Sequence, residues 1–141
     1  MRILTMGVLL AFFTSNLFAC DTIVEAAGLG KVKEIQRFLD SGKSINSTDE
    51  EGMTPLMMAA LSRKYTNMKF LIEHGANIKA KDNDGTTTLM GLCIGGTSKD
   101  IPIVKLLLSK GASLTTKDRD GNTAKELCKN FGTKIYNATM K

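Results

Sequence analysis

Apolar residues in this chain recur in short stripes at helical spacing, and the stripes are followed by glycines. The stripes of the clearest unit are Leu56, Ala59 and Ala60, then Met68, Leu71 and Ile72. Steps of three and four residues place such side chains on one face of a helix. Gly75 follows at the position where a glycine ends a helix in the left-handed conformation. The pattern predicts two short amphipathic helices joined by a turn.

A polar motif precedes these stripes. Asp-x-x-Gly-x-Thr begins at Asp49, Asp82 and Asp118, in steps of 33 and 36 residues. Its Gly suits a tight turn, and in the first copy Thr54 is a helix cap followed by Pro55 at the first helical position. A period near 33 predicts stacked helical units rather than one globular core.

Four units follow from this period: about 21–48, 49–81, 82–117 and 118–141. The third has three extra residues between Gly95 and Asp100, with Ser98 or Asp100 expected to cap a helix that opens near Pro102. The first and last units are incomplete, as terminal repeats that cap a stack are.

The segment Thr54 to Ala59 reads Thr-Pro-Leu-Met-Met-Ala. It resembles the Thr-Pro-Leu-His-x-Ala signature of the ankyrin-repeat family, and weaker copies begin at Thr87 and Thr123. The resemblance covers Asp21 to about Tyr136. It implies an all-α solenoid of about four helix-turn-helix repeats with connecting β-turn loops. The His of the family signature is replaced by Met57, Met90 and Glu126, which predicts turns held more by packing than by polar contacts.

Residues 1–19 have the layout of a secretory signal peptide: Arg2, an apolar run from Met6 to Phe13, and Ala19 at the end. We therefore expect an exported, periplasmic product whose ankyrin-repeat domain spans residues 20–141. Leu17 to Cys20 also resembles a bacterial lipoprotein signal. A lipidated Cys20 that anchors the chain to a membrane is the alternative to a product without a lipid, which we favour because no polar tether follows.

The chain has 19 basic and 14 acidic side chains and a net charge of +5. The charges are dispersed, without the basic runs and interleaved aromatic residues typical of a nucleic-acid site, so we expect no nucleic-acid partner. The net charge predicts some bias toward acidic partners.

Cys93 and Cys128 fall on the inner helices of adjacent repeats and allow two interpretations. A disulfide would link the last two repeats. Helices pack about 10 Å apart, whereas a disulfide needs Cα atoms within about 7 Å. We expect two buried thiols and keep the disulfide as the alternative.

Catalytic and cofactor motifs are missing from the sequence. His74 is the single histidine, and its place before Gly75 suits a helix-end cap. The run Gly95 to Lys99 lacks the spacing of a phosphate-binding loop. We predict no enzyme, no catalytic residue, no metal site and no cofactor.

The family resemblance implies a concave recognition face, formed by the turn tips and the solvent side of the inner helices. The matching residues are Glu50, Glu51, Met53, Leu61, Ser62, Asn83, Asp84, Thr86, Ile94, Arg119, Asp120, Asn122 and Phe131. Four of them, Met53, Leu61, Ile94 and Phe131, are apolar and expected to be exposed, as in a protein-binding site.

We therefore expect an exported module, monomeric when free, that binds one protein partner through its concave face. Its most concrete form is an inhibitor or immunity protein of a toxin or enzyme. The alternative is an accessory of a redox enzyme such as catalase that delivers or protects haem, as the resemblance to periplasmic ankyrin-repeat proteins implies. Met57 and Met90 would then bind the haem.

Overall fold

The computed structural model describes residues 20–131 and 133–139. The predicted signal peptide, residues 1–19, lies outside the described residues. The side chain of Phe131 is also outside the description, so its predicted exposure stays a prediction.

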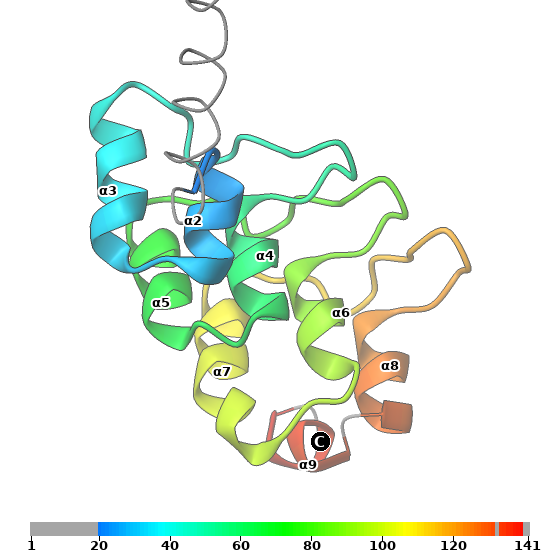
Figure 1. The fold of residues 1–141 in the computed structure, drawn as a ribbon. Helices are drawn as coiled ribbons and strands as arrows, with labels where there is room; N and C mark the ends of the chain where they lie inside the picture. Colours follow the sequence, from blue (N-terminus) through cyan, green and yellow to red (C-terminus); the bar gives the residue numbers. More distant parts are fainter. Residues whose placement is uncertain (1–19, 132, 140–141) are drawn as a thin grey trace, which may run out of the picture.

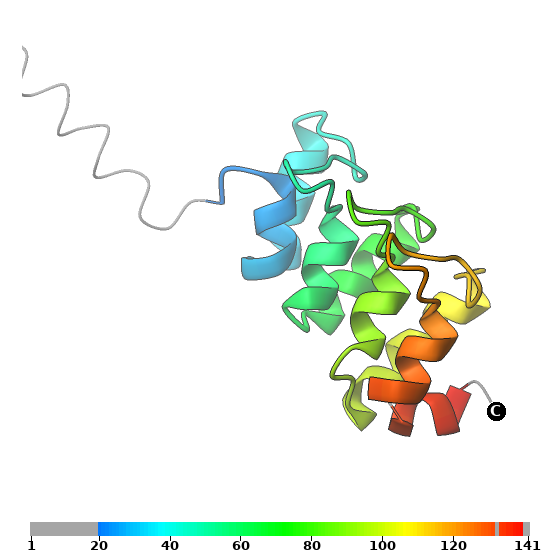
Figure 2. The same cartoon turned by 90° about the vertical axis from the view of Figure 1, so that its right-hand side faces the viewer.

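Helices in two layers make up the stack (Figures 1 and 2). The inner layer consists of α2 (Ile23–Leu29), α4 (Pro55–Leu61), α6 (Thr88–Cys93) and α8 (Ala124–Phe131). The outer layer consists of α3 (Val32–Asp40), α5 (Tyr65–Glu73), α7 (Ile101–Ser109) and α9 (Thr133–Thr139), with a short 3-10 helix η1 (Ser98–Asp100) before α7. In the described part of the chain no strand forms, and one isolated bridge joins Lys117 to Thr123. The prediction of an all-α solenoid of helix-turn-helix repeats is confirmed.

The starts and ends of the helices follow from their capping residues. Thr22, Thr54 and Thr87 each accept a hydrogen bond from the third backbone N–H of an inner helix, which satisfies a donor with no partner inside the helix. The outer helices α3, α5 and α7 end before Gly42, Gly75 and Gly111, whose φ angles are 86°, 85° and 90°. A side chain strains this left-handed conformation, so glycine is suited to these positions.

The core is an apolar seam between the two layers. Its largest fully buried apolar side chains include Ile35, Leu56, Met68, Leu71, Leu92 and Leu107. They continue from one helix pair to the next, so each repeat buries its apolar face against its neighbours.

Asn67 lies in the first turn of α5, which begins two residues earlier, at Tyr65. The Asn67 side chain is buried and donates to the carbonyl oxygens of Ala27 and Gly30, at 2.9 and 3.1 Å. It therefore joins the first repeat to the second.

Asp100 does not cap α7 with its side chain, as one alternative predicted. It occupies the cap position of α7, but its carboxylate turns inward and is fully buried. Oδ1 accepts from Arg63 and Tyr65, each at 2.9 Å, and Oδ2 accepts from the backbone N–H of Thr97 at 2.7 Å. The insertion of the third repeat is thereby fixed against the second.

Cys93 and Cys128 form a disulfide, with Cα atoms 4.4 Å apart. The expectation of two free thiols was wrong, because it compared an axis-to-axis spacing with a Cα–Cα limit. Each Cα lies about 2.3 Å from its helix axis, so facing Cα atoms of helices 8–10 Å apart come within about 3–5 Å. The disulfide joins the last repeat to the third.

Candidate functional site

The three turn tips share one hydrogen-bonded geometry. The carboxylates of Asp49, Asp82 and Asp118 each accept a 2.8 Å hydrogen bond through Oδ1 from the backbone N–H four residues later. Gly52, Gly85 and Gly121, with φ angles of 76°, 77° and 84°, complete the turns. Burial opposes ionisation of Asp118, but donors from Asn122 and from the turn backbone outweigh it, so its pKa is lower than usual. The tip conformation is therefore fixed by its own residues.

Neighbouring tips are joined into one continuous surface. We call residues 49–53, 82–86 and 118–122 the tip row. Asn83 donates its backbone N–H to the carbonyl oxygen of Glu51 at 3.0 Å and its side-chain amide to that of Glu50 at 2.9 Å. Arg119 donates its backbone N–H to the carbonyl oxygen of Asp84 at 2.8 Å and pairs with the Asp84 carboxylate at 2.7 Å. The loops project past the inner helices, away from the outer ones (Figure 1).

The predicted tip residues differ in exposure. Those that face solvent are Glu50, Glu51, Asn83, Asp84, Arg119 and Asp120. Those that are half-buried at the base of the tips are Met53, Thr86 and Asn122. Met53 is thus less exposed than expected.

Three aliphatic side chains are exposed at the C-terminal ends of the inner helices. Leu29, Leu61 and Ile94 are 75%, 69% and 50% exposed, and we call them the aliphatic column. Each lies seven residues after the capping threonine of its repeat. Leu61 and Ile94 were predicted, whereas Leu29 was missed because no tip loop precedes it. Counting seven residues from Thr22 would have found it.

The remaining predicted residues lie beside this column. Ser62, next to Leu61, is half-buried. In the last repeat the column position is occupied by Asn130, which is exposed and polar. Among the side chains that the structure describes, which do not include that of Phe131, the exposed large apolar ones of the inner helices lie in the first three repeats.

Met57 and Met90 are core residues. They are 5% and 0% exposed, and their sulfur atoms lie 3.5 and 3.4 Å from the backbone N–H donors of Thr54 and Thr87. In the last repeat the Glu126 carboxylate accepts from the Thr123 hydroxyl at 2.8 Å and from the Thr123 N–H at 2.9 Å, and these two hydrogen bonds lower the pKa of Glu126. These turns were expected to be held more by packing than by polar contacts. In the structure, the Met57 and Met90 sulfur atoms and the Glu126 carboxylate accept backbone N–H groups at the positions of the family's His.

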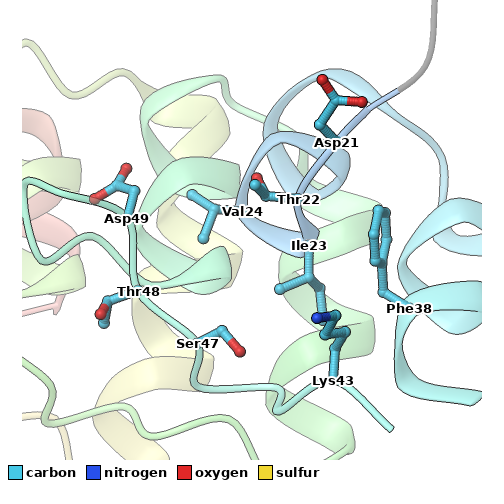
Figure 3. A pocket seen from close by; sticks show the side chains of 9 residues that line it. All are labelled: Asp21, Thr22, Ile23, Val24, Phe38, Lys43, Ser47, Thr48 and Asp49. Atoms are coloured by element: carbon cyan, nitrogen blue, oxygen red, sulfur yellow. The ribbon is translucent and has the colours of Figure 1, made fainter. Parts of the chain in front are cut away.

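A shallow depression of about 190 Å³ lies at the N-terminal end of the stack (Figure 3). Ile23 and Phe38 line its apolar part, and Lys43 and Asp49 are among its polar side chains. Small-molecule sites usually measure about 300–1,000 Å³. We assign no ligand to this depression.

His74 and Cys20, two other residues singled out in the sequence, each contact neighbouring residues of the fold. The ring of His74 stacks on Phe70, and its Nδ1 lies 2.8 Å from the Phe70 carbonyl oxygen, as expected for a group at a helix end. Cys20 is half-buried against the core. Burial and the nearby carboxylates of Glu25 and Glu34 raise the pKa of its thiol.

Among residues 20–131 and 133–139, no helix is long and apolar enough to cross a membrane. The same residues bring together no group of three or more His, Cys, Asp or Glu side chains that could bind a metal ion.

Comparison with known proteins identifies the fold family. Residues 23–118 match the family model for ankyrin repeats in three copies. This is more than half of the chain, and the chain belongs to the ankyrin-repeat family. Domains of this family are interaction modules rather than catalytic folds.

Relatives share the repeats but not one activity. The chain is 39% identical to palmitoyltransferase akr1 of Emericella nidulans over 69 residues, 48% of this chain and 9% of the relative. It is 41% identical to an ankyrin repeat-containing protein of Schizosaccharomyces pombe over 64 residues, 45% of this chain and 31% of the relative. It is 32% identical to human ankyrin repeat and SOCS box protein 6 over 82 residues, 50% of this chain and 20% of the relative. The chain spans less than a third of each, so these names give no activity for it.

Proposed function

We propose that this protein is an exported interaction module that binds a protein partner through its concave face, formed by the tip row and the aliphatic column. The observation that carries the proposal is the column, because three aliphatic side chains at equivalent positions are exposed on adjacent inner helices. Exposed apolar side chains with a polar rim are typical of protein interfaces.

The rigidity of this face also supports the proposal. Hydrogen bonds between neighbouring tips hold the row in one conformation before a partner arrives. A surface that is ordered in advance loses less conformational entropy on binding. We infer that the module acts by covering its partner, as an inhibitor or immunity protein of a toxin or enzyme.

Export is proposed on two features. The signal-peptide pattern of residues 1–19 directs a chain out of the cytoplasm, and the Cys93–Cys128 disulfide suits an oxidising compartment such as a periplasm. We favour a product without a lipid, because Cys20 packs against the core and α2 begins three residues after it, at Ile23. The mass of the mature N-terminus tests this, since a diacylglycerol group on Cys20 would contradict it.

No observation on the described residues favours a function as a haem accessory. Met57 and Met90, its suggested ligands, are buried in the stack with their sulfur atoms beside backbone N–H donors.

The experiment is co-purification of the tagged protein with its partner from the exported fraction, with two double variants. Leu61→Asp with Ile94→Asp replaces two apolar contacts by carboxylates and should weaken binding at least about a hundredfold, as for two interface hot spots. Thr66→Asp with Ser109→Asp adds the same charge to the outer helices of the same repeats and should leave binding unchanged.

Circular dichroism of both variants controls for folding. Full binding by Leu61→Asp with Ile94→Asp, at unchanged helical content, would place the interface elsewhere and contradict the proposal. Titration of the purified partner's activity with the module tests the inhibitor hypothesis. Unchanged activity at saturating module would rule it out.

A further inference from the structure

The charges of this protein are divided unevenly between its surfaces. The tip row holds seven of the 14 acidic side chains and one of the 19 basic side chains, Arg119. The chain as a whole nevertheless carries a net charge of +5. One strongly acidic surface therefore lies on a protein that is otherwise basic.

Part of this acidic charge is not used by the fold. Asp49, Asp82 and Asp118 accept hydrogen bonds within their own turns, and Asp84 pairs with Arg119. The exposed side chains of the other three acidic residues, Glu50, Glu51 and Asp120, have no hydrogen-bond or ion-pair partner among the described residues. They lie in the first and last loops, at the two ends of the row.

One partner can cover both the aliphatic column and these carboxylates. Each column residue lies seven residues after its capping threonine, a rise of about 10 Å at 1.5 Å per residue, and the tip loops project past the inner helices (Figure 1). An interface of about 800 Å² on each partner is wide enough to include both. Because charges are screened over about 8 Å at physiological salt, the carboxylates act on the part of the partner that covers the tips. Acidic side chains on the partner would be repelled there, whereas basic ones would be attracted.

We propose that the partner of the concave face is a different protein, one that places basic side chains against the tip row and apolar side chains against the aliphatic column. This inference rests on the proposed function, because it names the chemistry of the partner of that same face. It reverses the bias toward acidic partners that the net charge predicts, since the basic side chains lie outside the tip row.

Two synthetic helical peptides serve as probes, with the same length and the same leucine stripe. One carries Lys at every polar position and the other carries Glu. Fluorescence anisotropy at 0.15 M salt should show at least tenfold tighter binding of the Lys peptide. The triple variant Glu50→Gln, Glu51→Gln and Asp120→Asn should weaken that binding about tenfold, at a few tenths to one kcal/mol for each exposed charge contact.

A matched triple variant, Asp21→Asn, Asp40→Asn and Glu73→Gln, removes three exposed carboxylates outside the tip row. It changes the net charge by the same amount and should alter the affinity less than twofold. Equal binding of the two peptides, or equal losses in the two triple variants, would overturn the proposal.

The neutral variant Leu61→Ser with Ile94→Ser separates this inference from the proposed function. Loss of peptide binding in this variant, but not in the tip triple variant, would keep the concave face and overturn the basic partner. Unchanged binding in it would count against the concave face itself. Sedimentation tests a second copy as the occupant. Concentration-dependent dimers that disappear in the tip triple variant would mean that another copy's basic surface covers the tips, which would also overturn the proposal.

Discussion

Two arginine–aspartate pairs join neighbouring repeats, and they differ mainly in burial. Arg63 and Asp100 lie 2.9 Å apart in the helical layers, with side chains 32% and 0% exposed. Arg119 and Asp84 lie 2.7 Å apart in the tip row, with side chains 67% and 70% exposed. Removing one partner of a buried pair leaves a buried group without its partner, whereas an exposed pair is solvated and contributes little.

The difference separates stability from recognition. In the helical layers, the Asp100 cluster and the disulfide are buried clasps between repeats. In the tip row, exposed hydrogen bonds order a surface whose residues can change with little effect on folding. The residues of such a surface can be substituted to suit a partner while the repeats stay folded.

The largest expected effect is that of the buried disulfide. Cys93→Ala with Cys128→Ala should lower the free energy of unfolding by about 4 kcal/mol, because the bond closes a loop of 35 residues. Urea unfolding of the oxidised protein and of the variant measures it. A Cys20→Ala variant controls for the third cysteine. Equal urea midpoints for the double variant and the oxidised protein would mean that the disulfide does not stabilise the helical layers.

The buried ion pair comes next. Asp100→Ala should cost about 3 kcal/mol, the lower end for a broken buried pair, because the partly exposed Arg63 can regain water. Urea unfolding again measures the change. A loss below about 1 kcal/mol would make the two arginine–aspartate pairs equivalent and would break the comparison.

The exposed pair should contribute much less. Arg119→Ala should lower the free energy of unfolding by less than about 1 kcal/mol, yet it removes contacts to Asn83 and Asp84 that order the tip row. Urea unfolding measures the effect of Arg119→Ala on stability, and a separate binding assay measures its effect on the partner's affinity. A stability loss as large as that of Asp100→Ala would show that the tips also hold the stack together.

The smallest expected effect is the contribution of Asp118 to the pH dependence of stability. Although burial alone would raise the pKa of Asp118, the hydrogen bonds of its turn lower it overall. Its ionised form therefore stabilises the fold above the pKa of the unfolded chain, and this contribution is lost as the pH falls through the folded-state pKa. Asp118→Asn should show less loss of stability than the unchanged protein between neutral and acidic pH. Identical pH profiles would contradict the assigned direction of the pKa.

The sequence predicts the repeat architecture well because each repeat is specified locally. Helix periodicity, capping threonines and the glycines at 42, 75 and 111 act within a few residues, and the structure confirms them. The exposure of Leu61 and Ile94 could also be predicted from nearby residues, since both follow the buried apolar stripe of an inner helix.

Long-range contacts account for what the sequence did not predict. The partners of Asp100, Arg63 and Tyr65, are 37 and 35 residues away, and Arg63 has a left-handed backbone with φ 54°, uncommon for a residue other than glycine. The disulfide depends on how closely two helices approach, which the period of the repeat does not determine. The charge of the tip row is hidden in the net charge, because basic side chains elsewhere outweigh it.

Hydrogen–deuterium exchange of the partner complex tests most directly whether the concave face is the binding surface. Partner binding should slow exchange in the tip loops and at the C-terminal ends of α4 and α6, around Leu61 and Ile94. The outer helices α5 and α7 should exchange at the same rate with and without the partner. Protection confined to α5 and α7, with unchanged exchange in the tip row, would contradict the account.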